Sequence, residues 1–176
     1  MIESGVVNRL SGLLFCALAL LLGACDSGDN CGPGEKCDCH DGNDCYIACS
    51  GSGCNETCEN QVHCGGVCDD HCSFVCHDMN DCTTSCGANC DASCHNTVSC
   101  GANIGPNSHY SCHDITRCGV TADSGSVIDC QNVPTCEVVC NGSCQVNCTG
   151  TQTCRVYCGG PNADPRECGN GGDCAC

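Results

Sequence analysis

Three histidines recur at a fixed spacing and could bind a metal ion. His77, His95 and His113 are 18 residues apart, and each directly follows a cysteine. If every 18-residue unit forms one layer of a stack, the three imidazoles form a ladder with steps of about 4.8 Å, which could hold Zn²⁺ or Cu²⁺ between layers. The simpler interpretation is a solvent-facing turn residue copied with its repeat. We favour it because the same column continues as Glu59 and Gln131.

An acidic segment near the N terminus is a second candidate for metal binding. Residues 38–44 read Asp-Cys-His-Asp-Gly-Asn-Asp and offer the oxygen ligands that Ca²⁺ prefers. The EF-hand template does not fit, because counting back from Gly42 puts Cys37 and Cys39 where acidic ligands belong. We therefore interpret the segment as a solvated linker.

The chain carries none of the common catalytic signatures. No G-x-S-x-G, H-E-x-x-H, C-x-x-C or phosphate-binding loop occurs in it. Thiol catalysis would need a cysteine spared from pairing, and an even number of cysteines argues against one. The sequence therefore predicts a non-enzymatic protein without a cofactor.

Cysteine is the residue that dominates the chain. Without Cys16 and Cys25, which belong to the N-terminal segment considered below, 28 of the 30 cysteines remain, and from residue 25 onward there is no Leu or Trp. An ordinary apolar core is out of reach for such a composition, so we expect disulfides and an oxidising compartment. Metal storage by thiolates, as in metallothioneins, is the alternative, but C-x-C occurs only at Cys37/Cys39 and Cys174/Cys176.

The cysteines follow a period of 18 residues. Four cysteines in steps of four, from Cys64 to Cys76, are repeated from Cys82 to Cys94, and later cysteines continue the same columns. A strict internal repeat of this length predicts a solenoid of stacked units.

The residues between the cysteines decide between helix and strand. In late repeats the pattern is C-x-V-x-C, with the central apolar residue two places after a cysteine. Positions i and i+2 share a face in a strand but not in a helix. The central residues are Val120, Val138 and Val156 in one half of the repeat and Phe74, Ala92, Tyr110, Ile128 and Val146 in the other.

Two kinds of turn separate the predicted strands, one of three residues and one of five. The second place of the five-residue turn always tolerates a left-handed backbone; it holds Asn60, Asp78, Asn96, Asp114, Asn132 and Gly150. The fold class we predict is all-β, a disulfide-stapled, two-sided β-solenoid with 18-residue coils. It has about six coils within residues 45–158, preceded by an acidic tether and cysteine cluster (25–44) and followed by a cysteine cap (159–176).

Disulfides have to cross the turns, because cysteines four apart in one strand are about 13 Å apart. In two coils both cysteines that flank the three-residue turn are replaced together, as Ile104 with Ser108 and Ala122 with Ser126. Joint loss indicates that these positions pair with each other. The pairs are Cys49–Cys54, Cys68–Cys72, Cys86–Cys90 and Cys140–Cys144.

The remaining columns pair either within a coil or across the five-residue turn into the next coil. Pairing within coils leaves an odd number of cysteines at each end of the chain, whereas pairing across the turn leaves four at each end. We therefore favour the second map, in which the pairs are Cys58–Cys64, Cys76–Cys82, Cys94–Cys100, Cys112–Cys118, Cys130–Cys136 and Cys148–Cys154.

The first residues predict export. Arg9 precedes an apolar run over residues 13–22 that is too short to span a bilayer as a helix. Residues 22–25, Leu-Gly-Ala-Cys, resemble the lipobox of bacterial lipoproteins, which implies cleavage of residues 1–24 and a lipid on Cys25. The alternative is an ordinary signal peptide cut near Ala24.

Together, the lipobox and the 18-residue unit resemble hyper-cysteine-rich bacterial surface lipoproteins with C-x-V-x-C repeats. This likeness implies a membrane-anchored lipoprotein of the cell envelope. The net charge of −16 makes nucleic acid a poor partner, and no protein partner can be named. We therefore expect a structural or interaction role, with metal binding as the alternative.

Overall fold

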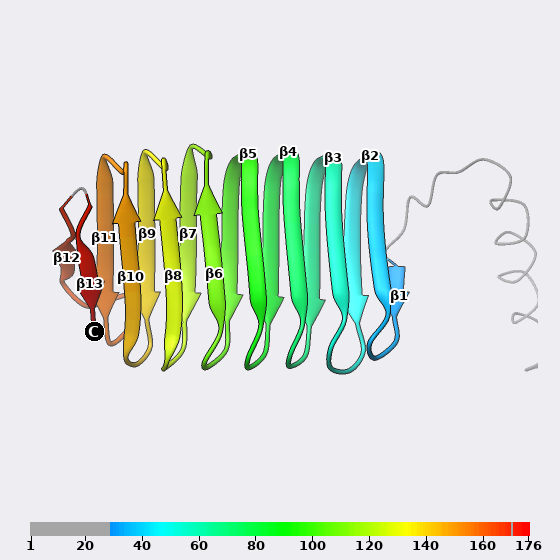
Figure 1. Cartoon of the computed structure of the whole chain (residues 1–176), viewed down its shortest axis with the longest axis horizontal. Coiled ribbons are helices and arrows are strands. Elements are labelled where there is room, and N and C mark those ends of the chain that lie inside the picture. Colours follow the sequence, from blue (N-terminus) through cyan, green and yellow to red (C-terminus); the bar gives the residue numbers. More distant parts are fainter. Residues whose placement is uncertain (1–28, 170) are drawn as a thin grey trace, which may run out of the picture.

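The computed structural model of the chain describes residues 29–169 and 171–176. These residues form an all-β solenoid of about seven coils, which contains no helix. Figure 1 shows the coils side by side along one axis, from β1 to β13. The described part holds no apolar helix of membrane-spanning length. Cys25 and the export signal expected over residues 1–24 lie outside the described residues.

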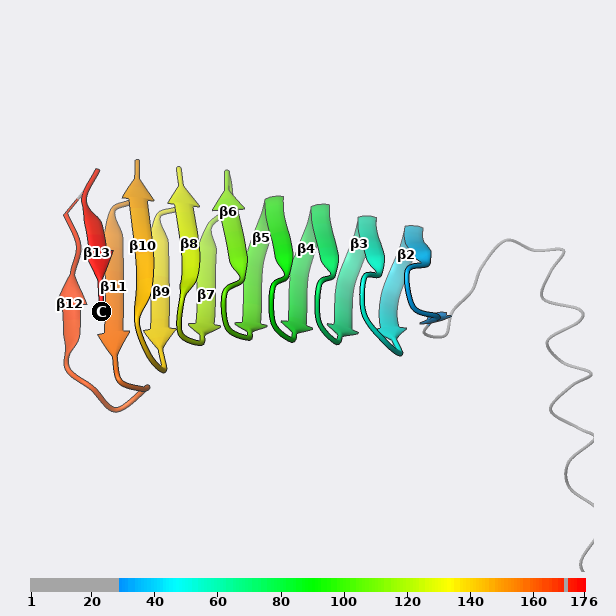
Figure 2. The same ribbon diagram turned by 60° about the horizontal axis from the view of Figure 1, so that its bottom comes forward.

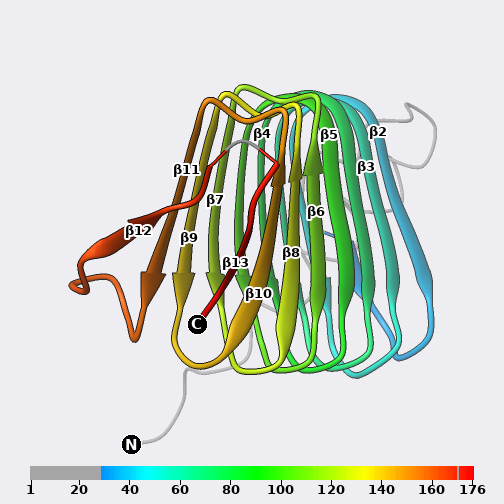
Figure 3. The same cartoon turned by 60° about the vertical axis from the view of Figure 1, so that its left-hand side comes forward.

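The described strands differ in length along the stack. Four long strands each follow both sides of a coil, whereas later coils consist of two shorter strands. Figure 3 shows β7, β9 and β11 on one side of the flattened coil and β6, β8 and β10 on the other. The long strands are β2 (Lys36–Cys49), β3 (Asn55–Cys68), β4 (Ser73–Cys86) and β5 (Asp91–Ile104). The shorter ones are β6 (His109–His113), β7 (Arg117–Ala122), β8 (Ser126–Gln131), β9 (Thr135–Cys140), β10 (Cys144–Thr149) and β11 (Thr153–Cys158), and those at the ends are β1 (Asp29–Cys31), β12 (Pro165–Glu167) and β13 (Asp173–Ala175).

Equivalent residues of successive coils are paired in parallel. Cys58 pairs with Cys76, Cys76 with Cys94, and Cys94 with Cys112. The 18-residue period of the sequence is therefore the rise from one coil to the next, as predicted.

The core consists of inward cysteines and the residues between them. The eight central residues of the C-x-V-x-C pattern are at most 3% exposed, which confirms the strand interpretation. A further inward column lies at the middle of the five-residue turn and was not predicted. Its apolar members Met79, Ile115 and Val133 are 0–6% exposed, so each long turn also adds to the core.

The long turns bend where the sequence predicts a left-handed backbone. Asn60 has a φ of 53° and Gly150 one of 68°, and the intervening equivalents have positive φ as well. In the early coils parallel pairing continues through the turn, for example between Met79 and Thr97, so the two expected short strands merge into one. Pro134 interrupts this pairing in a later turn because it has no amide hydrogen to donate.

The stack begins earlier than predicted. Residues 36–40 of β2 pair with residues 55–59 of β3, and β1 pairs with residues 47–49. The predicted boundary at Cys45 therefore falls within the first coil, and the solenoid has about seven coils instead of six. An extra residue in the turn Ser50-Gly51-Ser52-Gly53 makes the first step 19 residues, as in Cys39 opposite Cys58, and this hid the repeat.

Two short antiparallel strands cover the last coil. β12 pairs with β11 and β13 pairs with β10, so both sides of the coil receive a strand. Figure 2 shows β12 and β13 at the end of the stack. This arrangement matches the cap predicted for residues 159–176, because open strand edges invite pairing with other chains.

Candidate functional site

Disulfides across the long turns form a continuous column through the stack. Each links one coil to the next with Cα atoms 6.3–6.5 Å apart, and residue by residue they are the pairs favoured by the parity of the cysteines. They are Cys58–Cys64, Cys76–Cys82, Cys94–Cys100, Cys112–Cys118, Cys130–Cys136 and Cys148–Cys154. Cys39–Cys45 extends the column into the first coil, because Cys39 lies opposite Cys58.

A second group of disulfides closes the short turns. Its members are the four pairs inferred from joint replacement, Cys49–Cys54, Cys68–Cys72, Cys86–Cys90 and Cys140–Cys144. The two coils without such a bond use serine instead. The Ser108 hydroxyl accepts a hydrogen bond from the Cys90 amide at 3.0 Å, and the Ser126 hydroxyl accepts one from the Ser108 amide at 3.2 Å. Hydrogen bonds between coils thus replace the covalent link within a coil.

All 28 cysteines of the described ranges are disulfide-bonded, since four more bonds lie at the ends. The additional pairs are Cys31–Cys37, Cys39–Cys45, Cys158–Cys176 and Cys168–Cys174, which the sequence had left open. A thiolate nucleophile is therefore not available in this part of the chain.

The predicted ladder of imidazoles is present, and its rings stack face to face. The ring centroids of His77 and His95 are 5.2 Å apart, and those of His95 and His113 are 4.7 Å apart, with interplanar angles of 12° and 6°. The lone pairs of ring nitrogens lie in the ring planes, so in parallel rings they run alongside one another and do not converge on one ion. This geometry favours a structural ladder over a Zn²⁺ or Cu²⁺ site.

Carboxylates flank the histidine ladder. Nε2 of His77 is 3.2 Å from Glu59, whose other oxygen is 2.5 Å from Nδ1 of His40 in the first coil. In the middle of the ladder, Nδ1 of His95 is buried and has no hydrogen-bond partner among the described residues. Burial, followed by the neighbouring imidazoles of His113 and His77, lowers the pKa of His95, so its ring favours the neutral form.

A second histidine site, which the sequence analysis missed, spans three coils on one outer side. Nδ1 of His109 is 2.9 Å from Asp91 in the coil before it, and Nε2 is 2.7 Å from Asp129 in the coil after it. Burial opposes the imidazolium form, but hydrogen bonds to Asp129 and Asp91 outweigh it and raise the pKa of His109. The signal was the 18-residue spacing of Asp91 and His109 in one outward column.

One carboxyl group is buried inside the solenoid. Glu56 occupies the inward column of Phe74, is 1% exposed, and neither of its carboxyl oxygens has a hydrogen-bond partner in the described part of the chain. Burial raises its pKa to about 7. Gly66 opposite leaves the space that the Glu56 and Phe74 side chains fill, since a Cβ there would collide with both.

The acidic segment over residues 38–44 belongs to the first coil. The Asp38 carboxylate is 2.7 Å from Nζ of Lys36, and a hydrogen bond to this ammonium group lowers the pKa of Asp38. Asp41 has a φ of 53° and takes the left-handed place of a regular long turn. The interpretation of this segment as a solvated linker is therefore wrong, whereas weak binding of Ca²⁺ stays a prediction.

Comparison of the chain with protein-family models, known proteins and solved structures gives no match. Sequence and structure alone therefore have to indicate what the protein does. Its most regular feature is the column of disulfides that joins each coil to the next.

Proposed function

We propose that this protein is a non-enzymatic structural or interaction lipoprotein of the bacterial cell envelope. The lipobox-like residues 22–25 support export and lipid attachment at Cys25. The fourteen disulfides of the described residues support an oxidising compartment. The membrane is then one partner, reached through the lipid.

The observation that carries the proposal is the disulfide column across the long turns. A solenoid is held together by contacts between neighbouring units, and here each neighbour is also attached covalently. Seven coils at about 4.8 Å per step give a rod roughly 30 Å long that resists unstacking. Such a rod suits a spacer or a rigid binding surface outside the cell membrane.

The two sides of the rod offer different surfaces to a protein partner. On the side of β7, β9 and β11, Tyr46 is 51% exposed and Val67 is 41% exposed in adjacent coils. On the opposite side the outward residues include Ser93 and His109. A partner that recognises apolar surface would use the side with Tyr46 and Val67.

Lipid attachment is tested by growing bacteria that express the full chain with a fatty acid that carries a chemical handle. We expect the label on the wild-type protein in the membrane fraction, and no label on Cys25→Ser. A wild-type protein that is exported and soluble without label would refute the lipoprotein proposal.

Interaction is tested by photo-crosslinking on intact cells of the native host. A photoreactive residue replaces Val67 in one variant and Ser93 in its control, so that each side of the rod is sampled. We expect one defined adduct from the Val67 position and none from the Ser93 position. A lack of adducts from both positions would count against an interaction role.

A further inference from the structure

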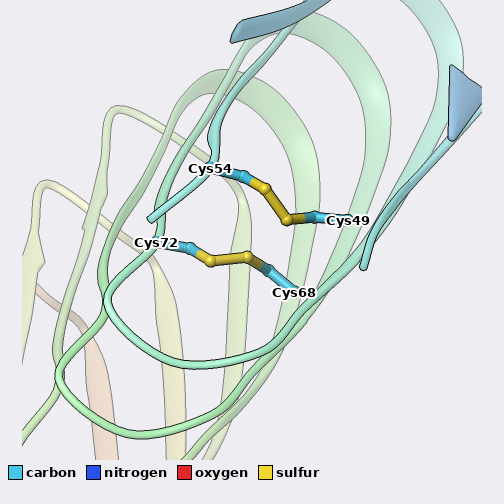
Figure 4. Close-up of side chains that lie close together, drawn as sticks. All are labelled: Cys49, Cys54, Cys68 and Cys72. Atoms are coloured by element: carbon cyan, nitrogen blue, oxygen red, sulfur yellow. A yellow bond between two sulfur atoms is a disulfide. The ribbon is translucent and has the colours of Figure 1, made fainter. Parts of the chain in front are cut away.

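Two stacked short-turn disulfides bring four sulfur atoms into one cluster. Cys49–Cys54 and Cys68–Cys72 lie in adjacent coils, and Figure 4 shows the two bonds next to each other. The four sulfur atoms lie within 4.8 Å of one another, and all four residues are buried. We propose that reduction of these two bonds creates a tetrathiolate site for a soft divalent cation such as Zn²⁺ or Cd²⁺. This inference goes beyond the proposed function and does not depend on it.

The spacing of the cysteines fits such a site. Structural zinc sites commonly pair their ligands as C-x₂₋₄-C, and here the pairs are Cys49-x₄-Cys54 and Cys68-x₃-Cys72. A tetrahedral site with Zn–S bonds of about 2.3 Å needs sulfur atoms about 3.8 Å apart. Four sulfurs that already share a span of 4.8 Å can reach this geometry through side-chain rotation.

Hydrogen bonds hold the short turns in place without the sulfur atoms. The Gly53 amide donates to the Asp70 carbonyl at 3.0 Å, and the Ser73 amide donates to the Cys54 carbonyl at 2.9 Å. The chain itself contains coils without a short-turn disulfide, at Ile104 with Ser108 and at Ala122 with Ser126, and these coils keep the same parallel pairing. Reduction at this place therefore leaves the stack folded.

Reductants reach the short-turn bonds more easily than the adjacent long-turn bonds. Cys49 and Cys68 are 7% and 6% exposed, whereas Cys58 and Cys76 are fully buried. The long-turn column thus stays oxidised and keeps the coils attached while the site forms.

The reaction balances with a dithiol as reductant. Each protein disulfide takes two electrons and two protons from one dithiol, which becomes a disulfide, so two dithiols yield four protein thiols. Binding of one Zn²⁺ or Cd²⁺ then releases four protons, and the occupied site carries a charge of −2. Affinity should therefore increase with pH, because thiolates and not thiols are the ligands.

The test uses the full-length oxidised protein, a phosphine reductant in the absence of oxygen, and Cd²⁺ as the probe. The phosphine takes up the oxygen atom of water as it reduces a disulfide, and it leaves two thiols. We expect the ultraviolet absorption of Cd–thiolate bonds, and protection of Cys49, Cys54, Cys68 and Cys72 from alkylation when Cd²⁺ is present. Mass spectrometry identifies the protected peptides and counts the bound ions.

Matched variants follow the replacements that the chain already contains. Cys68→Ala with Cys72→Ser copies the pair Ala122 and Ser126 and should bind one Cd²⁺ fewer per chain than wild type. The control, Cys86→Ala with Cys90→Ser, makes the same change one coil further on and should bind as much as wild type. Circular dichroism checks that both variants keep their β structure. Equal Cd²⁺ binding by both variants, or loss of the β spectrum on reduction before Cd²⁺ binds, would overturn the proposal.

Discussion

Replacement of Glu56 by Gln should change how the stability of the protein depends on pH. Glu56 is 1% exposed, and both of its carboxyl oxygens lack hydrogen-bond partners among the described residues. Its pKa in the folded protein is about 7, above the ordinary value of 4.5, because burial disfavours the carboxylate. The folded protein thus binds the proton more tightly than the unfolded chain does. The stabilisation is complete below pH 4.5, decreases as pH rises toward 7, and is lost above it.

The size of the effect follows from the two pKa values. A difference from 4.5 to about 7 corresponds to roughly 3 kcal/mol in the free energy of unfolding. Glu56→Gln is neutral at every pH, so it should be more stable than wild type by up to this amount at about pH 8 and nearly equal to it at about pH 4. Guanidinium unfolding with all disulfides intact, followed by far-ultraviolet circular dichroism, measures the difference.

Asp44→Asn is the matched control, because it makes the same change from carboxylate to amide at an exposed position of the first coil. We expect its unfolding free energy to stay within about 0.5 kcal/mol of wild type. If Glu56→Gln were no more stable than wild type at the higher pH, or if Asp44→Asn gave the same increase, the argument from a buried, unpaired carboxyl group would be wrong.

Three further predictions follow from the contacts of single residues. Gly66→Ala should destabilise the protein by about 1–3 kcal/mol through overpacking, while Gly101→Ala, whose new Cβ would meet no atom closer than 3.8 Å, should be tolerated in the same unfolding assay. Asp129→Asn should lower stability more at pH 6 than at pH 9, because the raised pKa of His109 adds stability at low pH that is lost as pH rises through the folded-state pKa; an equal loss at both values would contradict this ion pair. His95→Gln should make the protein less sensitive to acid, since the lowered pKa of His95 adds stability above its unfolded pKa that is lost as pH falls; a variant that loses as much stability as wild type between pH 7 and pH 5 would show that the ladder does not resist protonation.

Much of the solenoid could be predicted because its repeat is written in one residue type. The cysteine columns gave the rise per coil, the C-x-V-x-C pattern gave the inward face, and Asn or Asp at the second turn place gave the left-handed bend. Joint replacement at Ile104 and Ser108 was sufficient to pair the short-turn cysteines. These signals are local, and every coil repeats them.

Features that occur once in the chain were not predicted. The first coil was missed because one inserted residue shifts its cysteines by 19 positions instead of 18. Glu56 was missed because a carboxyl group in an apolar column contradicts the pattern that defines the column. The geometry of the imidazoles, which decides against convergence on a metal ion, depends on side-chain rotation that spacing does not encode.

The attachment of each coil to the next by a disulfide is the central claim about this molecule. It is tested most directly by mapping the disulfide-linked peptides of the oxidised protein in coils four to six, where short-turn bonds are missing and few other pairings are possible. We expect one peptide pair that joins Cys112 to Cys118 and another that joins Cys130 to Cys136. Links from Cys100 to Cys112 and from Cys118 to Cys130 would instead mean that the bonds close single coils, and the proposed rod would lose its covalent resistance to unstacking.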